Sequence, residues 1–359
     1  MSELRPSAED LQEAAAEELV ARQQHRTRRT IADLRAELRE MNALADSLEE
    51  RNALLESLQA KPQRARKLKP TKRKRGGKRP AAFVALASDW HTCEIVSRQS
   101  TGGINEHNQE IGVERAWRWA RSLVSLVKRE QASSEIQSLA IWLGGDMLVN
   151  DGLHYKSERT CDLSPPDEAR FIRDLLAELL TWIRAELDVP RIVVPTSWGN
   201  HDRSTPKMLA GHAGDYSHIQ PVYRDLAAWF GADSSMEFRI AESEFLPLDL
   251  HGYKVLFHHG HAIRFGGGVG GLAVPFLRAA GRLRADYDFS TLCIGHHHQR
   301  NVFQGGVGIA NGSLVGANGY SRALGLPSEP AAQVAFAVDL ERLEVANIYT
   351  IWGSDAASP

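Results

Sequence analysis

Five short polar clusters, most of them at the ends of apolar, β-like runs, constrain this chain more than any other feature. They are Asp89-Trp-His91, Gly145-Asp146, Gly199-Asn200-His201-Asp202, His258-His259-Gly260-His261 and Gly295-His296-His297-His298. A single cluster of this kind would be an ordinary turn or a packed core histidine. Five in sequence supply aspartates, an asparagine and histidines, which are ligands suited to a pair of divalent metal ions.

Apolar runs and helical patterns alternate through residues 81–359. The sequence predicts strands at Phe83–Ala87, Leu139–Leu143, Arg191–Pro195, Tyr253–Phe257, Thr291–Ile294, Val307–Ala310, Val334–Val338 and Glu344–Ile351. Helical patterns fall at Val113–Lys128 and Pro166–Leu187, and Ser164 followed by two prolines is a favourable start for the second. This order predicts an α/β sandwich with functional side chains on loops beyond the strand ends.

The first 80 residues have a different composition. Residues 1–60 favour helix, and residues 31–55 carry a heptad pattern, which indicates either a coiled coil that joins copies of the chain or a helix packed on the protein's own globular part. Residues 61–80 hold eleven Lys and Arg and no acidic residue, within a net charge of −2 for the whole chain. We expect a flexible linker that binds nucleic acid through its phosphates, or else a charged spacer without a ligand.

The cysteines and the hydropathy pattern limit the class of protein. Three scattered cysteines, Cys93, Cys161 and Cys293, indicate reduced, unpaired thiols and a cytoplasmic location. Cys93 is either an additional soft metal ligand or a buried bystander. No apolar stretch approaches the length of a membrane span and no signal peptide opens the chain, so we expect no membrane association.

The spacing of the clusters predicts which residues hold the metal ions. Asp89 and His91 lie on one turn after the first strand and can reach the same ion. Asp146 follows the second strand and is suited to bridge two ions. Further ligands would be the neutral amide of Asn200 and the imidazoles of His259, His296 and His298. Strand alternation favours His296 and His298 over His297, and would turn His258 away from the site.

The ordered set Asp-x-His, Gly-Asp, Gly-Asn-His-Asp, His-Gly and Gly-His-x-His resembles the calcineurin-like metallophosphoesterase superfamily over residues 82–351. The resemblance implies a four-layer α/β/β/α sandwich, here with an N-terminal helical extension, and two divalent ions: Mn²⁺ foremost, with Fe, Zn, Ni or Mg as alternatives. One ion would be held by Asp89, His91, Asp146 and His298. The other would be held by Asp146, Asn200, His259 and His296.

The resemblance also implies a mechanism. A hydroxide bridging the two ions would attack phosphorus in line, and His201 would act as the general acid. Protein phosphatases of this superfamily resemble Gly-Asp-x-x-Asp-Arg at the second cluster, but this chain has Val149 at the third position after Asp146. The carboxylate that orients His201 must then come from elsewhere, such as Asp151 or Asp202, and phosphoprotein substrates are disfavoured. Asp202 is alternatively a turn cap.

Three loop phrases also resemble metallophosphoesterases of tailed phages and prophages. They are Gly145-Asp146-x-x-x-Asn150-Asp151-Gly152-x-His154, Asn200-His201-Asp202-Arg203-Ser204-Thr205-x-Lys207 and Asn311-Gly312-Ser313-Leu314-x-Gly316. These metallophosphoesterases are distantly similar to the nuclease subunit of the bacterial SbcC–SbcD repair complex, and they would place the protein in the host cytoplasm. The phrases make His154, Arg203 and Lys207 candidates for holding substrate phosphates, with a surface polar residue as the alternative for each. His261 is a further candidate substrate contact.

Three functions follow from these observations. The first is a metal-dependent phosphodiesterase that acts on nucleic acid, with the basic linker as its recruiting segment. The second is a small-molecule phosphatase or phosphodiesterase whose basic linker is incidental. The third is a coiled-coil scaffold that binds nucleic acid and whose metallophosphoesterase domain has lost turnover. The complete ligand set favours the enzymes over the scaffold.

Overall fold

The computed structural model describes residues 77–150, 160–209, 213–264, 271–323 and 328–354. The heptad region and residues 61–76 of the basic segment lie outside the described residues, as do His154 and Asp151. The described part is a mixed α/β structure with two sheets. None of the helices in these ranges is long and apolar enough to cross a membrane.

The larger sheet has six strands, in the order β11-β10-β1-β2-β3-β4. Strands β1 to β4 run parallel to one another, whereas β10 pairs antiparallel with both β1 and β11. Their bounds are β1 Arg79–Ala87, β2 Ser134–Leu143, β3 Ile192–Pro195, β4 Met236–Arg239, β10 Ala332–Asp339 and β11 Glu344–Trp352. The central strands are near-continuous apolar runs because both faces of this sheet are covered.

The smaller sheet has five strands, in the order β5-β6-β7-β9-β8. The three inner strands β6, β7 and β9 are mutually parallel, and the outer two are antiparallel to their neighbours. Their bounds are β5 Leu246–Leu250, β6 Tyr253–His258, β7 Thr291–Ile294, β8 Asn301–Phe303 and β9 Gly308–Ala310. In both sheets the parallel strands therefore bring their carboxyl ends to one edge, where the polar clusters follow.

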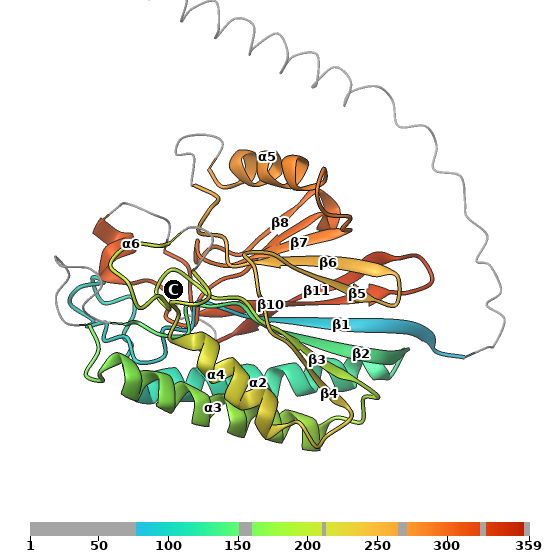
Figure 1. The fold of residues 1–359 in the computed structure, drawn as a ribbon, viewed down its shortest axis with the longest axis horizontal. Coiled ribbons are helices and arrows are strands. Elements are labelled where there is room, and N and C mark those ends of the chain that lie inside the picture. The colour runs from blue at the N-terminus through green and yellow to red at the C-terminus, as the bar shows by residue number, and fades with distance from the viewer. Residues whose placement is uncertain (1–76, 151–159, 210–212, 265–270, 324–327, 355–359) are drawn as a thin grey trace, which may run out of the picture. The chain divides into compact units, whose positions relative to one another are not determined.

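Helices flank the sheets (Figure 1). The helices are α2 Gln109–Gln131, α3 Pro165–Glu186, α4 Ile219–Trp229, α5 Ala273–Leu283 and the short α6 Gly319–Ala323. Helices α2, α3 and α4 lie beside the larger sheet, and α5 lies on the side of the smaller sheet (Figure 1). Ser164 caps α3 as the sequence predicts, because its side chain accepts a hydrogen bond from the Asp167 amide and prolines occupy the first turn.

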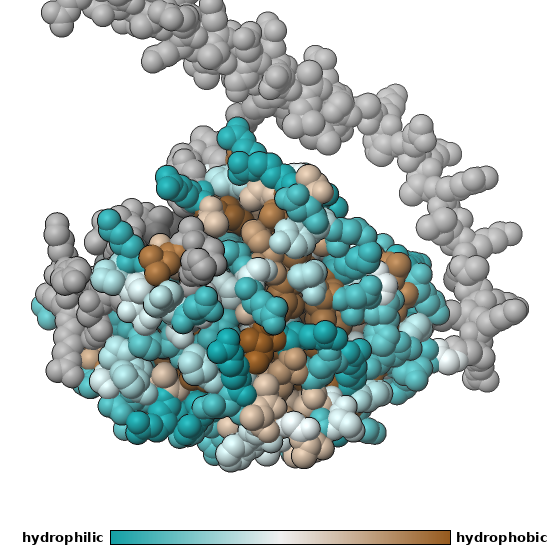
Figure 2. Space-filling view, viewed as in Figure 1, coloured by the Kyte–Doolittle hydropathy of each residue, from teal (hydrophilic) through white to brown (hydrophobic). Residues whose placement is uncertain are grey.

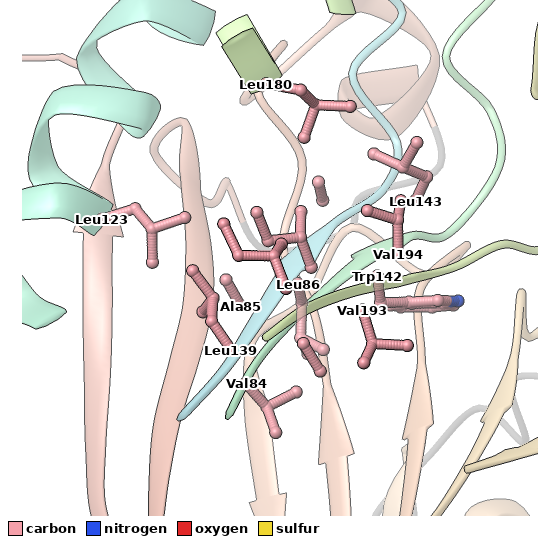
Figure 3. Close-up of a cluster of buried hydrophobic side chains, with 14 of the residues drawn as sticks. Val84, Ala85, Leu86, Leu123, Leu139, Trp142, Leu143, Leu180, Val193 and Val194 are labelled. Carbon is pink, nitrogen blue, oxygen red and sulfur yellow. The ribbon is translucent and has the colours of Figure 1, made fainter. Parts of the chain in front are cut away.

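The core lies between these layers (Figure 3). Leu123 of α2 and Leu180 of α3 point into the same cluster as Leu86 of β1, and all three are almost completely buried. On the other side, Trp142 of β2 stacks on Phe257 of β6 with ring centroids 5.4 Å apart, so the two sheets are in direct contact. Truncating a buried aromatic of this size to alanine costs about 3–5 kcal/mol. Hydrophilic residues dominate the face drawn in Figure 2.

The structure adds elements that the sequence pattern did not indicate and shifts several boundaries: β2 begins at Ser134 instead of Leu139, and α2 begins at Gln109 instead of Val113. Strands β4, β5 and β8 and helices α4, α5 and α6 were not predicted. Strand β1 begins at Arg79, two residues inside the expected linker 61–80, because Arg79 and Pro80 pair with Ser134 and Glu135 of β2. The Arg79 guanidinium also lies 3.5 Å from the carboxylate of Asp339 on β10.

Candidate metal centre

The loops that follow β1 and β2 are joined by backbone hydrogen bonds. The Asp89 amide donates to the Gly145 carbonyl at 3.0 Å, and the His91 amide donates to the Asp146 carbonyl at 3.1 Å. Because β1 and β2 are adjacent and parallel, their ends are neighbours, and these bonds hold the first two clusters side by side. Two clusters that are more than 50 residues apart in the sequence therefore lie side by side in the structure.

The loops that follow β6 and β7 of the smaller sheet contact the loop that follows β1. The Gly295 amide donates to the His259 carbonyl at 2.7 Å, which joins the clusters after β6 and β7. The His296 amide then donates to Oδ1 of Asp89 at 2.8 Å and so connects this pair to the larger sheet. Backbone amides thus join four of the five clusters, through carbonyls and the Asp89 carboxylate, and the cluster of His201 joins through Asp146.

Asp146 occupies the centre of this arrangement. Its Oδ2 lies 3.1 Å from Nε2 of His259 and 3.9 Å from Nε2 of His91, while its Oδ1 accepts the His201 amide at 2.7 Å. The residue is only 1% exposed. One carboxylate oxygen is thus shared between two histidines that come from different sheets, as a bridging ligand requires.

The expected ligands form two groups around Asp146. Asp89, His91 and His298 place one ligand atom each within 4.8 Å of one another, and so do Asp146, His259 and His296. Nε2 of His298 lies 3.4 Å from Oδ1 of Asp89. His201 forms an overlapping group with His91 and Asp146. Each of the two main groups therefore contains three of the four residues of one expected ligand set; the first lacks Asp146 and the second lacks Asn200.

Asn200 and His297 are placed by other observations. The side-chain oxygen of Asn200 is buried without a hydrogen-bond partner, as an oxygen that awaits a metal ion would be. His297 belongs to none of the metal-compatible groups found among the described residues. Strand alternation is the wrong reason for separating His297 from its neighbours, because β7 ends at Ile294 and the three histidines lie beyond it.

Backbone carbonyls orient three of the imidazole rings. The Nδ1 atoms of His91, His259 and His201 face the carbonyls of Leu148, Gly144 and Val149 at 3.0, 2.8 and 3.1 Å. A carbonyl can only accept, so in each neutral ring Nδ1 carries the hydrogen and Nε2 keeps its lone pair. For His91 and His259, Nε2 faces the carboxylates. The Nδ1–H tautomer is the one that a histidine needs to bind a metal ion through Nε2.

The backbone is strained at this site. Nine non-glycine residues in the described ranges have positive φ, and five of them are expected metal ligands, namely Asp89, His91, Asp146, His296 and His298, with φ between 39° and 67°. Such conformations cost free energy in residues other than glycine and persist where the surroundings impose them. Their concentration here indicates a site whose geometry serves function at the expense of stability.

The electrostatics also fit divalent cations. Burial raises the pKa of Asp146, but the charges of His259 and His201 outweigh it and hold the pKa well below its usual range. Burial lowers the pKa of His259, yet the charge of Asp146 dominates and raises it to about 10. Nε2 of His259 is buried and lacks an aligned hydrogen bond, although Asp146 is close. The carboxylates thus draw positive charge to this pocket, and a metal ion would supply it while satisfying Nε2.

A buried polar network that sequence patterns did not reveal holds Asp89. The Ser88 hydroxyl donates to Oδ2 of Asp89 at 2.5 Å, and Nδ2 of Asn311 donates to that hydroxyl at 3.0 Å and to the Gln333 side chain at 2.8 Å. All four residues are fully buried. The network fixes one carboxylate oxygen of Asp89 and leaves Oδ1 facing the histidines. Gln333 interrupts the apolar run of β10, and this was the available sequence signal.

The structure gives Asp202 and Arg203 roles in holding the loops. Oδ2 of Asp202 accepts the amides of Asp146 and Gly199 at 2.8 and 2.7 Å. Burial, together with the charge of Asp146, raises the pKa of Asp202 to about 7. The Arg203 guanidinium donates to the carbonyls of Thr205 and Asn200, so it stabilises its own loop. A substrate contact of Arg203 stays a prediction.

The remaining candidate residues are His261, His258, Lys207 and the cysteines, and each has different surroundings. Nε2 of His261 lies 3.2 Å from Oε2 of Glu244, and its ring is 5.7 Å from that of His259. His258 is buried and also faces Glu244. Lys207 is exposed. All three cysteines are free and buried, and Cys93 groups with Cys161 and Glu168, apart from the expected metal ligands.

Glycine at position 199 is required by the close approach of its loop to Asp146. A Cβ atom there would lie 2.0 Å from Oδ1 and 2.6 Å from the amide nitrogen of Asp146. We therefore expect Gly199→Ala to displace the shared carboxylate and to weaken Mn²⁺ binding by about 10- to 100-fold in isothermal titration calorimetry.

Gly281 provides the matched control for that substitution. It lies in α5, where an added Cβ would meet nothing within 4 Å. Gly281→Ala should leave Mn²⁺ affinity unchanged and raise thermal stability slightly, since alanine favours helix by about 0.5–1 kcal/mol. Equal affinities in both variants would show that Asp146 does not need the space that Gly199 provides.

Of three comparisons with known proteins, one found matches, among solved structures. No protein-family model matches the chain. No curated protein matches it either. Solved structures with some similarity include a conserved uncharacterised protein, a predicted phosphoesterase, from Streptococcus pneumoniae (12% identity, 75% of this chain and 98% of that chain, TM-score 0.29).

Two further structures are similar to a comparable degree. They are Vps29 complexed with Zn²⁺ from Entamoeba histolytica (11% identity, 76% of this chain and 99% of that chain, TM-score 0.28) and a phosphatase from Mycoplasma pneumoniae (12% identity, 76% and 93%, TM-score 0.30). With TM-scores below 0.5, these likenesses do not establish a family for this chain. The function has to be inferred from the site.

Proposed function

We propose that this chain is a two-metal-dependent phosphoesterase that hydrolyses phosphodiester bonds in nucleic acid. The observation that carries the proposal is the position of Asp146, whose Oδ2 lies between His259 and His91 at 3.1 and 3.9 Å. Around it, two separate groups of carboxylate and imidazole ligands converge from two sheets. Mn²⁺ is the ion that we propose first, with Fe, Zn, Ni or Mg as alternatives.

Divalent ions held there would polarise a phosphoryl oxygen and lower the pKa of a water molecule. The chain's own residues have distinct tasks around them. Asp146 holds the two ligand groups together, and the neutral amide of Asn200 adds a ligand without adding negative charge. His201, whose Nδ1 donates to the Val149 carbonyl, would protonate the leaving oxygen from Nε2 when its ring is in the imidazolium form.

The proposal includes the four-layer α/β/β/α sandwich of calcineurin-like metallophosphoesterases. It is supported by the contact of Trp142 with Phe257 between the two sheets and by the helices that flank them (Figure 1). In such a sandwich the parallel strands of both sheets end at one edge. The candidate metal ligands lie in the loops beyond that edge.

The nucleic-acid part of the proposal rests on the basic segment. Residues 61–75 contain nine Lys and Arg, a density of charge suited to phosphate backbones. The resemblance of the loop phrases to phage and SbcD-type enzymes points the same way. We further propose that residues 31–55 join copies of the chain, which would place several basic segments on one assembly.

A substrate panel tests this function. The full chain, loaded with Mn²⁺, should hydrolyse bis-p-nitrophenyl phosphate and should degrade single- or double-stranded DNA. A variant with the nine Lys and Arg of residues 61–75 replaced by Gln should retain the first activity and lose most of the second at moderate salt. The DNA activity of the unchanged protein should fall steeply as salt increases, because its substrate is held by charge.

The alternatives give different outcomes in the same panel. A small-molecule phosphatase would hydrolyse the nitrophenyl ester and leave DNA intact in both forms. An inactive scaffold would bind DNA but would hydrolyse nothing. Equal DNA degradation by the two forms would contradict the recruiting role of the basic segment and leave the hydrolase proposal standing.

A further inference from the structure

The ring of His201 is oriented by a loop, and the loop is held by a residue that sequence patterns did not single out. Nδ1 of His201 lies 3.1 Å from the carbonyl oxygen of Val149. Val149 occupies the position at which protein phosphatases of the calcineurin-like superfamily, which this sequence resembles, have a carboxylate. A backbone carbonyl therefore does the orienting here, and it can do so only if its own peptide is fixed.

A buried carboxylate from α3 fixes that peptide. Oε1 of Glu168 accepts the Val149 amide at 2.7 Å, and Oε2 accepts the Asn150 amide at 3.0 Å. Glu168 is completely buried, and it lies in the first turns of α3, where its own amide donates to the Ser164 carbonyl. Both oxygens of one rigidly mounted side chain thus clamp two successive amides of the loop, with the extra strength of charge-assisted hydrogen bonds.

The same loop is tied to the backbone of the His201 segment. Nδ2 of Asn150 donates to the carbonyls of His201 and Arg203 at 2.6 and 2.7 Å. Asn150 adopts φ of 56°, a conformation that asparagine tolerates better than most residues. The path from α3 to the imidazole is therefore continuous: Glu168 holds the Val149 and Asn150 amides, the Val149 carbonyl holds the ring, and the Asn150 side chain holds the main chain.

We propose that Glu168 is a positioning residue, which fixes the tautomer and direction of the His201 imidazole through the Val149–Asn150 peptide. Asp202 does not take this role, because Nδ1 of His201 faces the Val149 carbonyl, while Oδ2 of Asp202 accepts the Asp146 and Gly199 amides. The catalytic consequence rests on the proposed function. The orientation of the His201 ring by Glu168 does not depend on the proposed function. An experiment can therefore contradict the positioning role and the proposed function separately.

The test uses Glu168→Gln in the full chain. Glutamine keeps the shape of the side chain but has one acceptor oxygen, so its NH₂ group must face one of the two amide donors. One clamp bond is lost and the loop is loosened. The matched control is Glu178→Gln, the same substitution at an exposed position of the same helix.

The first readout is the state of the His201 ring. In ¹⁵N-histidine-labelled protein loaded with diamagnetic Zn²⁺, long-range ¹H–¹⁵N spectra should show the Nδ1–H form for His201, identified by its absence in His201→Asn. Glu168→Gln should shift this signal toward a mixture of the two tautomers, and Glu178→Gln should not. An unchanged His201 signal in Glu168→Gln would overturn the proposal, whatever the activity.

The second readout separates positioning from general damage. A leaving p-nitrophenolate needs little protonation, whereas the alkoxide released from a thymidine dinucleotide needs a proton. We expect Glu168→Gln to lower kcat about 10- to 100-fold for the dinucleotide and less than about threefold for bis-p-nitrophenyl phosphate, with KM and metal content unchanged. Equal losses on both substrates would contradict a positioning role.

The role of Glu168 can still be tested if the protein is inactive or if Glu168→Gln does not fold. If the unchanged protein hydrolyses neither substrate, the proposed function fails, while the spectra still decide the role of Glu168. If Glu168→Gln does not fold, Glu168→Asp takes its place, since the shorter side chain keeps the charge and withdraws the two acceptors. A normal His201 signal in that folded variant would count against the proposal equally.

Discussion

Replacing Asp146 by asparagine should abolish metal-dependent hydrolysis, with kcat/KM at least about 1,000-fold lower, equivalent to about 4 kcal/mol of transition-state stabilisation. The amide keeps the shape of the side chain and can still accept the His201 amide at Oδ1. It removes the negative charge from the oxygen that lies between His259 and His91. The two ligand sets expected from the sequence both include Asp146, so we expect metal content to fall from two ions per chain to one or none.

The effect should be specific to this carboxylate. Asp225→Asn, at an exposed position of α4 where the side chain lies 3.8 Å from Arg173, serves as the control and should change neither activity nor metal content. Metal content is measured by atomic emission after desalting, and activity with bis-p-nitrophenyl phosphate and Mn²⁺. An Asp146→Asn variant with two ions and near-normal turnover would contradict the shared role of Asp146.

The second large effect is expected at His201. His201→Asn should lower kcat by about 100-fold or more on substrates with poor leaving groups, because the proton donor is lost. Metal content should remain at two ions per chain, since the two main ligand groups do not include His201. This outcome separates a proton donor from a ligand, because His201 also lies in an overlapping group with His91 and Asp146.

The control for His201 is His251→Asn, at an exposed turn between β5 and β6 where φ is 55° and asparagine is tolerated. It should behave as the unchanged protein does in both assays. Loss of one ion from His201→Asn would assign His201 to the metal centre and remove it as the general acid.

Much of the fold could be predicted from the sequence wherever burial imposes a simple pattern. Strands such as β1, β2 and β10 are buried on both faces, and their apolar runs are visible in the sequence. Strands β4, β5 and β8 are short and lie at or beside sheet edges, so polar residues interrupt their apolar pattern. Their positions follow from pairing with distant partners, which no local pattern encodes.

In the candidate site, too, some residues could be predicted from the sequence and others could not. Its expected ligands could be found because each follows a strand, and parallel strands bring their ends together. The residues that hold those ligands were missed, since their roles depend on contacts across the chain, such as the Ser88 amide with the Gln333 side chain. Glu168 did carry a signal: it shares the apolar face of α3 with Ile172 and Leu175, where a charged residue must find buried partners.

The most direct measurement is the anomalous scattering of a crystal of the full chain grown with Mn²⁺. The expected result is two peaks at the joined strand ends, both contacted by Asp146, one also by Asp89, His91 and His298, and the other by Asn200, His259 and His296. A single peak, or peaks confined to the Glu244, His258 and His261 group or the Cys93, Cys161 and Glu168 group, would contradict the binuclear centre and with it the proposed hydrolase.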